Sequence, residues 1–198
     1  MKGILFSAPM VRAILERRKA VTRRIISPQP DGISTATIQP YKYTSGIDGR
    51  EFIKPPYRPG DIVYVKETWA TSVCLDDKPP RDTKDHGLPF WYLDGSVMYT
   101  GARTGGVSFM TPGKKRSPLF MPEWAARLHL EILNVRPERV QAITDEEAYR
   151  EGIPEWKYPD QTFNPIVRFH ELWDSLHPGS WEQNPYVWRI EFKERWRA

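Results

Sequence analysis

A dense block of cations near the amino terminus holds the residues best suited to chemistry. The chain reads ILERRKAVTRR over residues 14–24, in which Lys19 precedes the hydroxyl of Thr22 by three residues and Arg24 follows. Apolar residues at helical spacing before this block and β-branched residues after it predict a helix, a tight exit and then a strand. Such a junction would hold Lys19, Thr22 and Arg24 near one anionic or carbonyl-bearing ligand. Cations in a last helical turn also complement the helix dipole, so a purely structural role stays open.

A carboxylate at the end of another predicted helix is the second candidate. The run Thr144-Asp145-Glu146-Glu147 is typical of a capping box, and Gly152 predicts the stop of this short helix. Glu151 then lies at the helix C-terminus, where a negative charge opposes the macrodipole at a cost of up to about 1 kcal/mol. We therefore expect Glu151 to be either fully solvated or paired with a cation.

Charge and aromatic content favour nucleic acid as the partner. The 198 residues carry a net charge of +4 and a pI near 9.1, and the cations gather at 17–24 and at Lys114-Lys115-Arg116. A local basic patch attracts polyanions more than an acidic protein, and no amphipathic anchor for a membrane is evident. Eight Trp and nine Tyr could stack on unpaired bases for about 1 to 3 kcal/mol each, although most tryptophans in a domain are core.

Several classes of site are not expected. Cys74 is the one cysteine, so no internal disulfide can form; a reducing, cytoplasmic location is predicted, with Cys74 as a small buried residue. The four histidines lack metal-ligand spacing such as HExxH, so neither a metal nor a cofactor is predicted. The apolar run at the start is too short for a secretory signal, and no stretch approaches the roughly 20 apolar residues of a membrane span.

Periodicity and turn residues predict the remaining elements within one domain, residues 1–198. Strands are expected at 62–69, around 128–132 and at 186–192, with a hairpin pairing 91–93 with 97–99. A further helix follows the capping residues Asn164 and Pro165, and its apolar stripe is predicted to be core: Ile166, Phe169, Leu172, Trp173 and Leu176. Residues 28–55 and 76–120 are rich in turn residues and are predicted to be long loop insertions.

With these elements in place, the chain resembles the ASCH domain family of the PUA-like superfamily, in particular its long phage and prophage members. The resemblance is carried by ILERRKAVTRR at 14–24, PGDIVYVKETWA at 59–70, MPEWAARLHLEI at 121–132, ITDEEAYREGI at 143–153 and FHELWDSLHPGSWEQNPYVWRIEF at 169–192. It implies an α+β fold, a small β-barrel flanked by about three helices with the two insertions, and a cleft suited to RNA or a nucleobase.

The resemblance also implies a site. Small acetylcytidine amidohydrolases of this family carry a GRKTxTxR motif, of which this chain keeps Lys19, Thr22 and Arg24 but has Arg17 for the Gly and Ala20 for the first Thr. Their catalytic glutamate matches Glu151. The implied catalytic residues are therefore Lys19, Thr22 and Glu151. The expected substrate-binding residues are Arg18, Arg23, Arg24, Glu67, Trp69 and Trp124.

Three functions stay open on the sequence alone. In an amidohydrolase, Thr22 would attack an acyl carbonyl, and Lys19 would be a cation if Glu151 touches it or a base if the two are apart. A ribonuclease would use the same cations on phosphate and would depend less on Thr22. A non-catalytic module would hold RNA, a single strand or a modified nucleoside, with Trp69 or Trp124 as a stacking wall.

Overall fold

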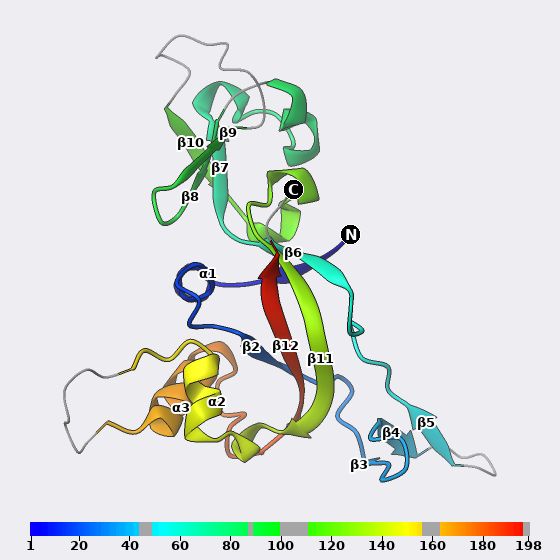
Figure 1. Ribbon diagram of the computed structural model, residues 1–198. Helices are drawn as coiled ribbons and strands as arrows, with labels where there is room; N and C mark the ends of the chain where they lie inside the picture. Colours follow the sequence, from blue (N-terminus) through cyan, green and yellow to red (C-terminus); the bar gives the residue numbers. More distant parts are fainter. Residues whose placement is uncertain (44–48, 87–88, 100–110, 156–162, 196–198) are drawn as a thin grey trace. The chain divides into compact units, whose positions relative to one another are not determined.

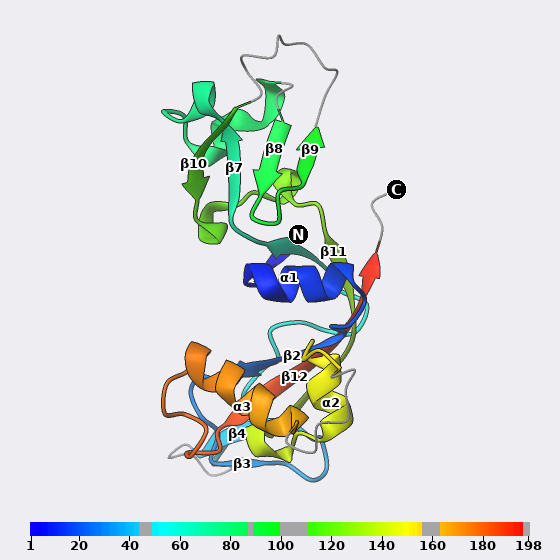
Figure 2. The same ribbon diagram turned by 90° about the vertical axis from the view of Figure 1, so that its left-hand side faces the viewer.

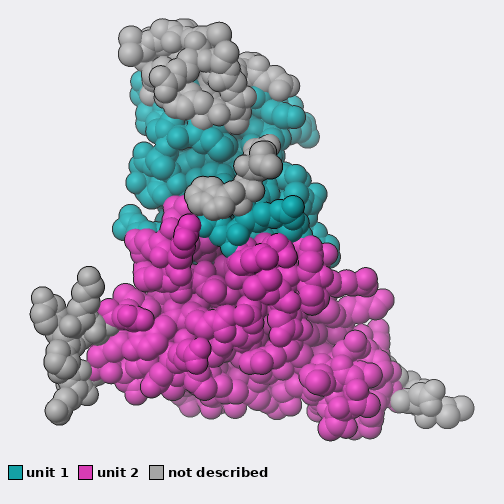
Figure 3. All heavy atoms as spheres, viewed as in Figure 1, with its two compact units in different colours: residues 1–12, 62–130, 194–198 teal, residues 13–61, 131–193 magenta. Residues whose placement is uncertain are grey.

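The computed structural model describes residues 1–43, 49–86, 89–99, 111–155 and 163–195. Its contacts divide the chain into two compact units, coloured separately in Figure 3. Unit 1 comprises residues 1–12, 62–130 and 194–198, and unit 2 comprises residues 13–61 and 131–193. The boundary falls within the first helix, α1 (Ala8–Leu15). Within the described residues no helix is long and apolar enough to cross a membrane.

Unit 1 contains two groups of strands. They are β1 (Lys2–Leu5), β6 (Ile62–Lys66), β7 (Trp69–Ser72), β8 (Pro89–Tyr92), β9 (Val97–Tyr99) and β10 (Pro112–Arg116). β1 pairs with β6 in parallel, whereas the other four form an antiparallel sheet in the order β10-β7-β8-β9 (Figure 2). The β8–β9 hairpin turns at Gly95, as the sequence predicts. The expected strand over 62–69 is divided at Glu67 and Thr68 into β6 and β7.

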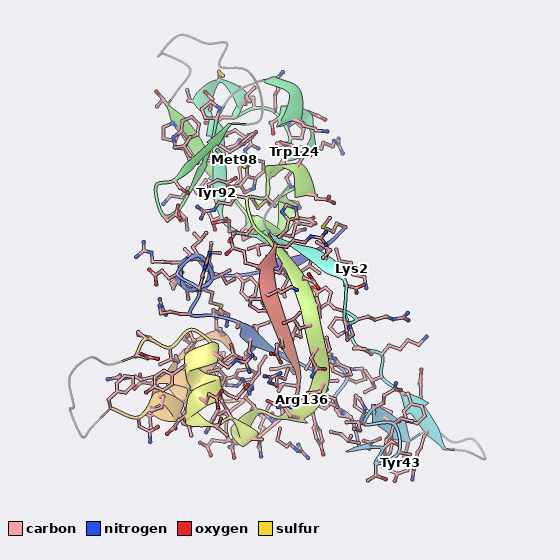
Figure 4. All side chains as sticks on the ribbon, in the orientation of Figure 1. Lys2, Tyr43, Tyr92, Met98, Trp124 and Arg136 are labelled. Carbon is pink, nitrogen blue, oxygen red and sulfur yellow. The ribbon has the colours of Figure 1, made fainter. Side chains whose placement is uncertain are left out.

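Aromatic side chains form the core of unit 1. Trp69, Phe90 and Tyr92 are buried there, and Met98 and Trp124 pack against them. Figure 4 labels Tyr92, Met98 and Trp124 at this cluster. The rings of Trp69 and Trp124 meet edge to face with centroids 6.2 Å apart, a favoured aromatic geometry. Several of the aromatic residues that the composition associated with nucleic acid are therefore buried in this core.

Unit 2 combines two helices with two sets of strands. Its elements are β2 (Val21–Ile25), β3 (Gly32–Ile33), β4 (Pro40–Tyr43), β5 (Arg50–Phe52), most of β11 (His129–Arg139), α2 (Asp145–Arg150), α3 (Pro165–Leu176) and most of β12 (Tyr186–Arg195). β12 lies between β11 and β2, and β2 pairs with it antiparallel. α2 and α3 lie side by side and cover one face of these strands (Figure 1).

Local signals explain where the helices of unit 2 begin. The Thr144 hydroxyl accepts a hydrogen bond from the Glu147 backbone N–H at 3.3 Å, and Asn164 caps α3 by accepting from the two N–H groups that follow Pro165. Both caps confirm the sequence prediction. The α3 stripe then packs toward the strands, with Phe169 and Trp173 buried.

The rest of the predicted stripe is less buried. Ile166 and Leu172 are only partly buried against the core, and Leu176 at the helix end is 47% exposed, so its prediction as core was wrong. A periodic pattern does not show where the covering surface ends.

The α+β class and three helices are confirmed, but no sheet of the described residues closes into a barrel. Each sheet keeps two edge strands: β1 and β2, β10 and β9, and β3 and β5. The predicted loop insertions also contain structure, since β3–β5 fall within residues 28–55 and β8–β10 within 76–120. These strands are short, and Gly, Pro and Asp interrupt them, which hides their alternation in the sequence. Cys74 is exposed, contrary to its predicted burial.

Gly152, directly after α2, provides a test of how this helix end packs. Its φ of +99° is one that residues with a Cβ rarely adopt, and an added Cβ would lie 3.0 Å from the Cβ of Ala13 and 3.3 Å from that of Lys19. We expect Gly152→Ala to lower the free energy of unfolding by about 2 to 4 kcal/mol in urea denaturation. Gly179→Ala is the matched control, because Gly179 also has positive φ (+68°) but nothing within 4 Å, so only about 1 kcal/mol is expected. Equal losses in the two variants would contradict the packing argument.

Candidate active site

The exit from α1 brings Lys19 against the end of α2. Arg17 adopts a left-handed φ of 59°, and the N–H groups of Arg18 and Lys19 both donate to the carbonyl of Ala13, at 2.9 and 3.0 Å. This tight turn is the one that the sequence predicts. Lys19 then forms an isolated antiparallel bridge with Glu151, which ends α2. Two residues 132 positions apart thus share one backbone contact.

The side chains of Lys19 and Glu151 form a buried ion pair. The Lys19 ammonium donates to Glu151 Oε2 at 2.6 Å and to the Glu151 backbone carbonyl at 2.7 Å. The two side chains are 0% and 4% exposed. Glu151 therefore has the cationic partner that a carboxylate at a helix C-terminus requires.

Burial controls the protonation of Lys19. Removal of the Lys19 ammonium from water lowers its pKa below the ordinary 10.5; the Glu151 carboxylate opposes this effect, and the charges of Arg24 and Arg23 add to it. From sequence we expected the contacting carboxylate to decide. In the structure desolvation is larger, because no part of the lysine side chain reaches solvent.

Arg23 connects Glu151 to two further carboxylates. Its Nη1 donates to Glu151 Oε1 at 3.0 Å, while Nη2 lies 2.7 Å from Glu138 Oε1 and 3.0 Å from Glu147 Oε2. The side chain is 1% exposed. Arg23 was predicted to bind substrate, but its donors are instead directed at carboxylates of the protein.

Glu147 is the centre of the network. Arg189 donates to both of its oxygens, at 2.8 Å from Nε and 2.7 Å from Nη2, and Arg150 adds a contact at 3.1 Å. Arg189, with Arg23 also contributing, lowers the pKa of Glu147 from 4.5 to about 2. Glu191 completes the set by accepting from Arg189 at 2.9 Å and from Arg150 at 2.6 Å. The Glu147 carboxylate thus accepts hydrogen bonds from arginines, which is not the role that a capping box would give it.

Thr22 and Arg24 share a face of β2. They are two residues apart in the strand, so their side chains leave the same face. Thr22 pairs with Ile190 of β12, and Arg24 pairs with Trp188. Thr22 is 3% exposed, and Arg24 is half-buried. Arg24 interacts electrostatically with both Glu151 and Lys19, whereas Arg23, from the opposite face of β2, contacts Glu151 directly.

Arg24 adds a further positive charge to this part of unit 2. The ion pairs described above join the cations Lys19, Arg23, Arg150 and Arg189 to the carboxylates Glu138, Glu147, Glu151 and Glu191, and Arg136 also pairs with Glu138. Burial lowers the pKa of the Arg24 guanidinium, but an arginine stays charged in a protein. A negative charge that develops near this guanidinium would be stabilised by it.

Arg18 lies at the margin of this group. Its Nη1 donates to the Gly152 carbonyl at 2.6 Å, and its Nε donates to Glu16 at 2.9 Å. The guanidinium thus ties the α1 exit to the residue that follows α2.

The other predicted substrate-binding residues belong to unit 1. Glu67 is buried and receives a bidentate pair of hydrogen bonds from Arg127, both at 2.8 Å. Burial raises the pKa of Glu67, and Arg127 opposes that shift. Trp69 is 1% exposed, so it offers no open face for stacking, and its predicted role as a stacking wall has no support in this packing. Trp124 is half-buried with its ring packed against Trp69 and Phe90, and its role stays a prediction.

Sequence reasoning missed Glu138, Glu147 and Arg189 as members of the network. Arg189 is a polar residue of the strand predicted at 186–192, yet its side chain is 3% exposed. A signal was present, because β2 and the last strand both carry arginines between apolar residues, and three carboxylates cluster in the first turn of α2. Among the described residues, no group of three or more His, Cys, Asp and Glu could hold a metal ion.

Comparisons with models of known protein families, with curated proteins and with solved structures find no match for this chain. The resemblance to the ASCH family therefore stays a prediction. What the chain does must be inferred from its own residues.

The pKa of Glu147 leads to a prediction about acid stability. A carboxylate whose pKa is near 2 in the folded state and near 4.5 when unfolded contributes stability above pH 4.5 that is lost as the pH falls toward 2. We expect Glu147→Gln to lower the free energy of unfolding at pH 7 by about 1 to 2 kcal/mol, after discounting the shift for partial exposure. The deficit relative to the parent should shrink between pH 4.5 and pH 2, as measured by urea denaturation.

Glu171→Gln is the matched control, since Glu171 forms an exposed pair with Arg168. We expect this substitution to change stability by less than about 0.5 kcal/mol at any pH. A Glu147→Gln deficit that stayed constant down to pH 2 would show that the carboxylate charge is not what stabilises the fold.

Proposed function

We propose that unit 2 carries a hydrolase site that removes the acyl group from an acylated nucleoside, with acetylcytidine as the favoured substrate. The observation that carries the proposal is the buried Lys19–Glu151 pair, with Nζ 2.6 Å from Oε2 and with Thr22 three residues after Lys19, in β2. A buried lysine with a lowered pKa can take a proton from a neighbouring hydroxyl, and a hydroxyl so activated is a nucleophile.

The proposed reaction assigns one step to each group. Lys19 passes a proton to Glu151 and then takes the Thr22 hydroxyl proton as the threonine oxygen attacks the acyl carbon. Arg24 stabilises the negative charge that develops on the carbonyl oxygen. The carbon–nitrogen bond breaks, the departing exocyclic amine takes its proton from Lys19, and water hydrolyses the acyl ester on Thr22. The products are cytidine, acetate and a proton that leaves to solvent; the Thr22 hydroxyl is restored, and Glu151 returns its proton to Lys19.

Access to the site is a constraint on this proposal. Lys19, Thr22 and Glu151 are all at least 95% buried, so an acyl group reaches Thr22 only when a neighbouring side chain moves. Arg24 is half-buried on the face of Thr22, which makes it the natural side chain to swing with an entering substrate. A buried site of this kind also keeps competing water away from the lysine.

Substitution at Thr22 tests the nucleophile. Thr22→Val keeps the β-branched shape in the strand but lacks the hydroxyl, so we expect deacetylation of acetylcytidine to fall at least about 100-fold. Thr22→Ser keeps the hydroxyl and should retain most of the activity. Product formation is measured by mass spectrometry, with thermal unfolding to confirm that both variants fold like the parent.

The same experiment separates the rival functions. A Thr22→Val protein that deacetylates at the parental rate would reject the mechanism. Cleavage of RNA that survives Thr22→Val but is lost in Glu151→Gln would favour a ribonuclease. Salt-sensitive binding of oligonucleotides without turnover of any substrate would favour a recognition module.

A further inference from the structure

Unit 1 contains a cavity apart from the residues around Lys19. Its volume is about 360 Å³, and its lining includes Ala70, Trp91, Leu93, Pro112, Gly113 and Lys115. These residues come from β7, from the β8–β9 hairpin and from β10, neighbouring strands of one sheet (Figure 2). This volume is at the lower end of the range for small-molecule sites, so it suits one small ligand.

Strand register places three of these residues in a row. Ala70 pairs with Trp91 on one side and with Lys115 on the other, so all three side chains leave the same face of the sheet. Neighbouring strands lie about 4.8 Å apart, so the backbones of Trp91 and Lys115 are separated by about 9.6 Å. Between them Ala70 contributes only a methyl group. An aromatic side chain and a cation thus stand on either side of a gap whose floor is an alanine.

The opposite face of the sheet is filled by the core. Trp69 pairs with Tyr92 and with Arg116, and both aromatic side chains are buried. Arg116 is buried as well, and it donates to the carbonyls of Lys78 and Leu75 at 3.0 and 2.7 Å. The basic cluster noted in the sequence is therefore split, and Lys115 is the member of it that lines the cavity.

Trp91 and Lys115 both remain available to a ligand. Trp91 is half-buried and Lys115 is exposed. Within the described part of the chain, no ion pair involves Lys115. A tryptophan face attracts planar rings, and a lysine attracts an anion such as a phosphate.

We propose that this cavity binds one nucleotide, with the base stacked on Trp91 and the phosphate paired with Lys115. The ligand is a nucleobase joined to a phosphate, whether a free mononucleotide or an unpaired residue of an RNA strand. The site is independent of the one proposed around Lys19, because its residues all belong to unit 1.

Binding of two probes to the full chain tests the proposal. The probes are cytidine 5′-monophosphate and hexacytidylate RNA, titrated by calorimetry between 50 and 200 mM salt. We expect Trp91→Ala to weaken binding about 5- to 100-fold, as stacking on one aromatic side chain implies. Lys115→Ala should weaken it about 2- to 5-fold and lower the salt dependence by about one phosphate contact. Ala70→Leu, which fills the gap, should also weaken binding.

Two neighbouring variants are the controls. Lys114→Ala removes an exposed lysine beside Lys115 that does not line the cavity, and Phe120→Ala removes an aromatic ring that is 70% exposed elsewhere in unit 1. Neither should change affinity. Thermal unfolding confirms that each variant folds, and if Trp91→Ala does not, the exposed Lys115→Ala and the ring-preserving Trp91→Phe carry the test.

Each outcome decides the proposal. Weaker binding of either probe in Trp91→Ala, with parental affinity in both controls, supports it. Binding of the mononucleotide identifies a free nucleotide as sufficient, and binding of the hexamer alone, with the same dependence on Trp91, identifies an RNA strand. No binding of either probe to the parent, or equal affinity in Trp91→Ala and the parent, overturns it. Thr22→Val should bind both probes like the parent, so failure of the proposed hydrolase leaves this result unaffected.

Discussion

The burial of arginine and lysine charges against the carboxylates of α2 is the constraint on which unit 2 depends. Lys19, Arg23 and Arg189 have side chains that are no more than 3% exposed, and each contacts Glu147 or Glu151. Removing Glu151 would leave the fully buried Lys19 charge without its carboxylate, at a cost of about 3 to 5 kcal/mol, whereas Arg23 and Arg189 each keep a further carboxylate when Glu147 is removed. Because the cations lie on the α1 exit, β2 and β12, this requirement fixes α2 relative to the strands more strictly than apolar packing alone would.

The same constraint shapes the chemistry open to the site. A lysine in water is a poor base at neutral pH, because it stays protonated up to about pH 10.4. Complete burial lowers the pKa of Lys19, and Glu151 provides an acceptor for the proton that leaves. A group whose protonation is set by competing burial and charge is typical of functional sites, although structural ion pairs produce it too. Thr22 distinguishes the two roles, since the ion-pair network itself does not use its hydroxyl.

Local signals in the sequence predicted local structure well. The helix caps at Thr144 and Asn164 and the tight exit before Lys19 agree with expectation, whereas the contact of Lys19 with Glu151, which the sequence left open, comes from residues distant in the chain. The failures involve distant partners. By its position in a strand Arg189 could face solvent, but in the structure it pairs with Glu147 of α2. Trp69 was predicted to stack on a base, but Phe90 and Trp124 pack against its ring. Whether a polar or aromatic side chain is buried depends on tertiary neighbours, which a single sequence does not specify.

The packing of the tryptophans limits which of them could stack on a base. Six of the eight tryptophans lie in the described residues, and Trp69, Trp173 and Trp188 are buried. Trp124 and Trp181 pack against the two cores. Trp91 differs because it lines a cavity and faces a lysine across an alanine. The high tryptophan content suggested base stacking. Among the described tryptophans that do not pack in a core, Trp91 is the one left for that role.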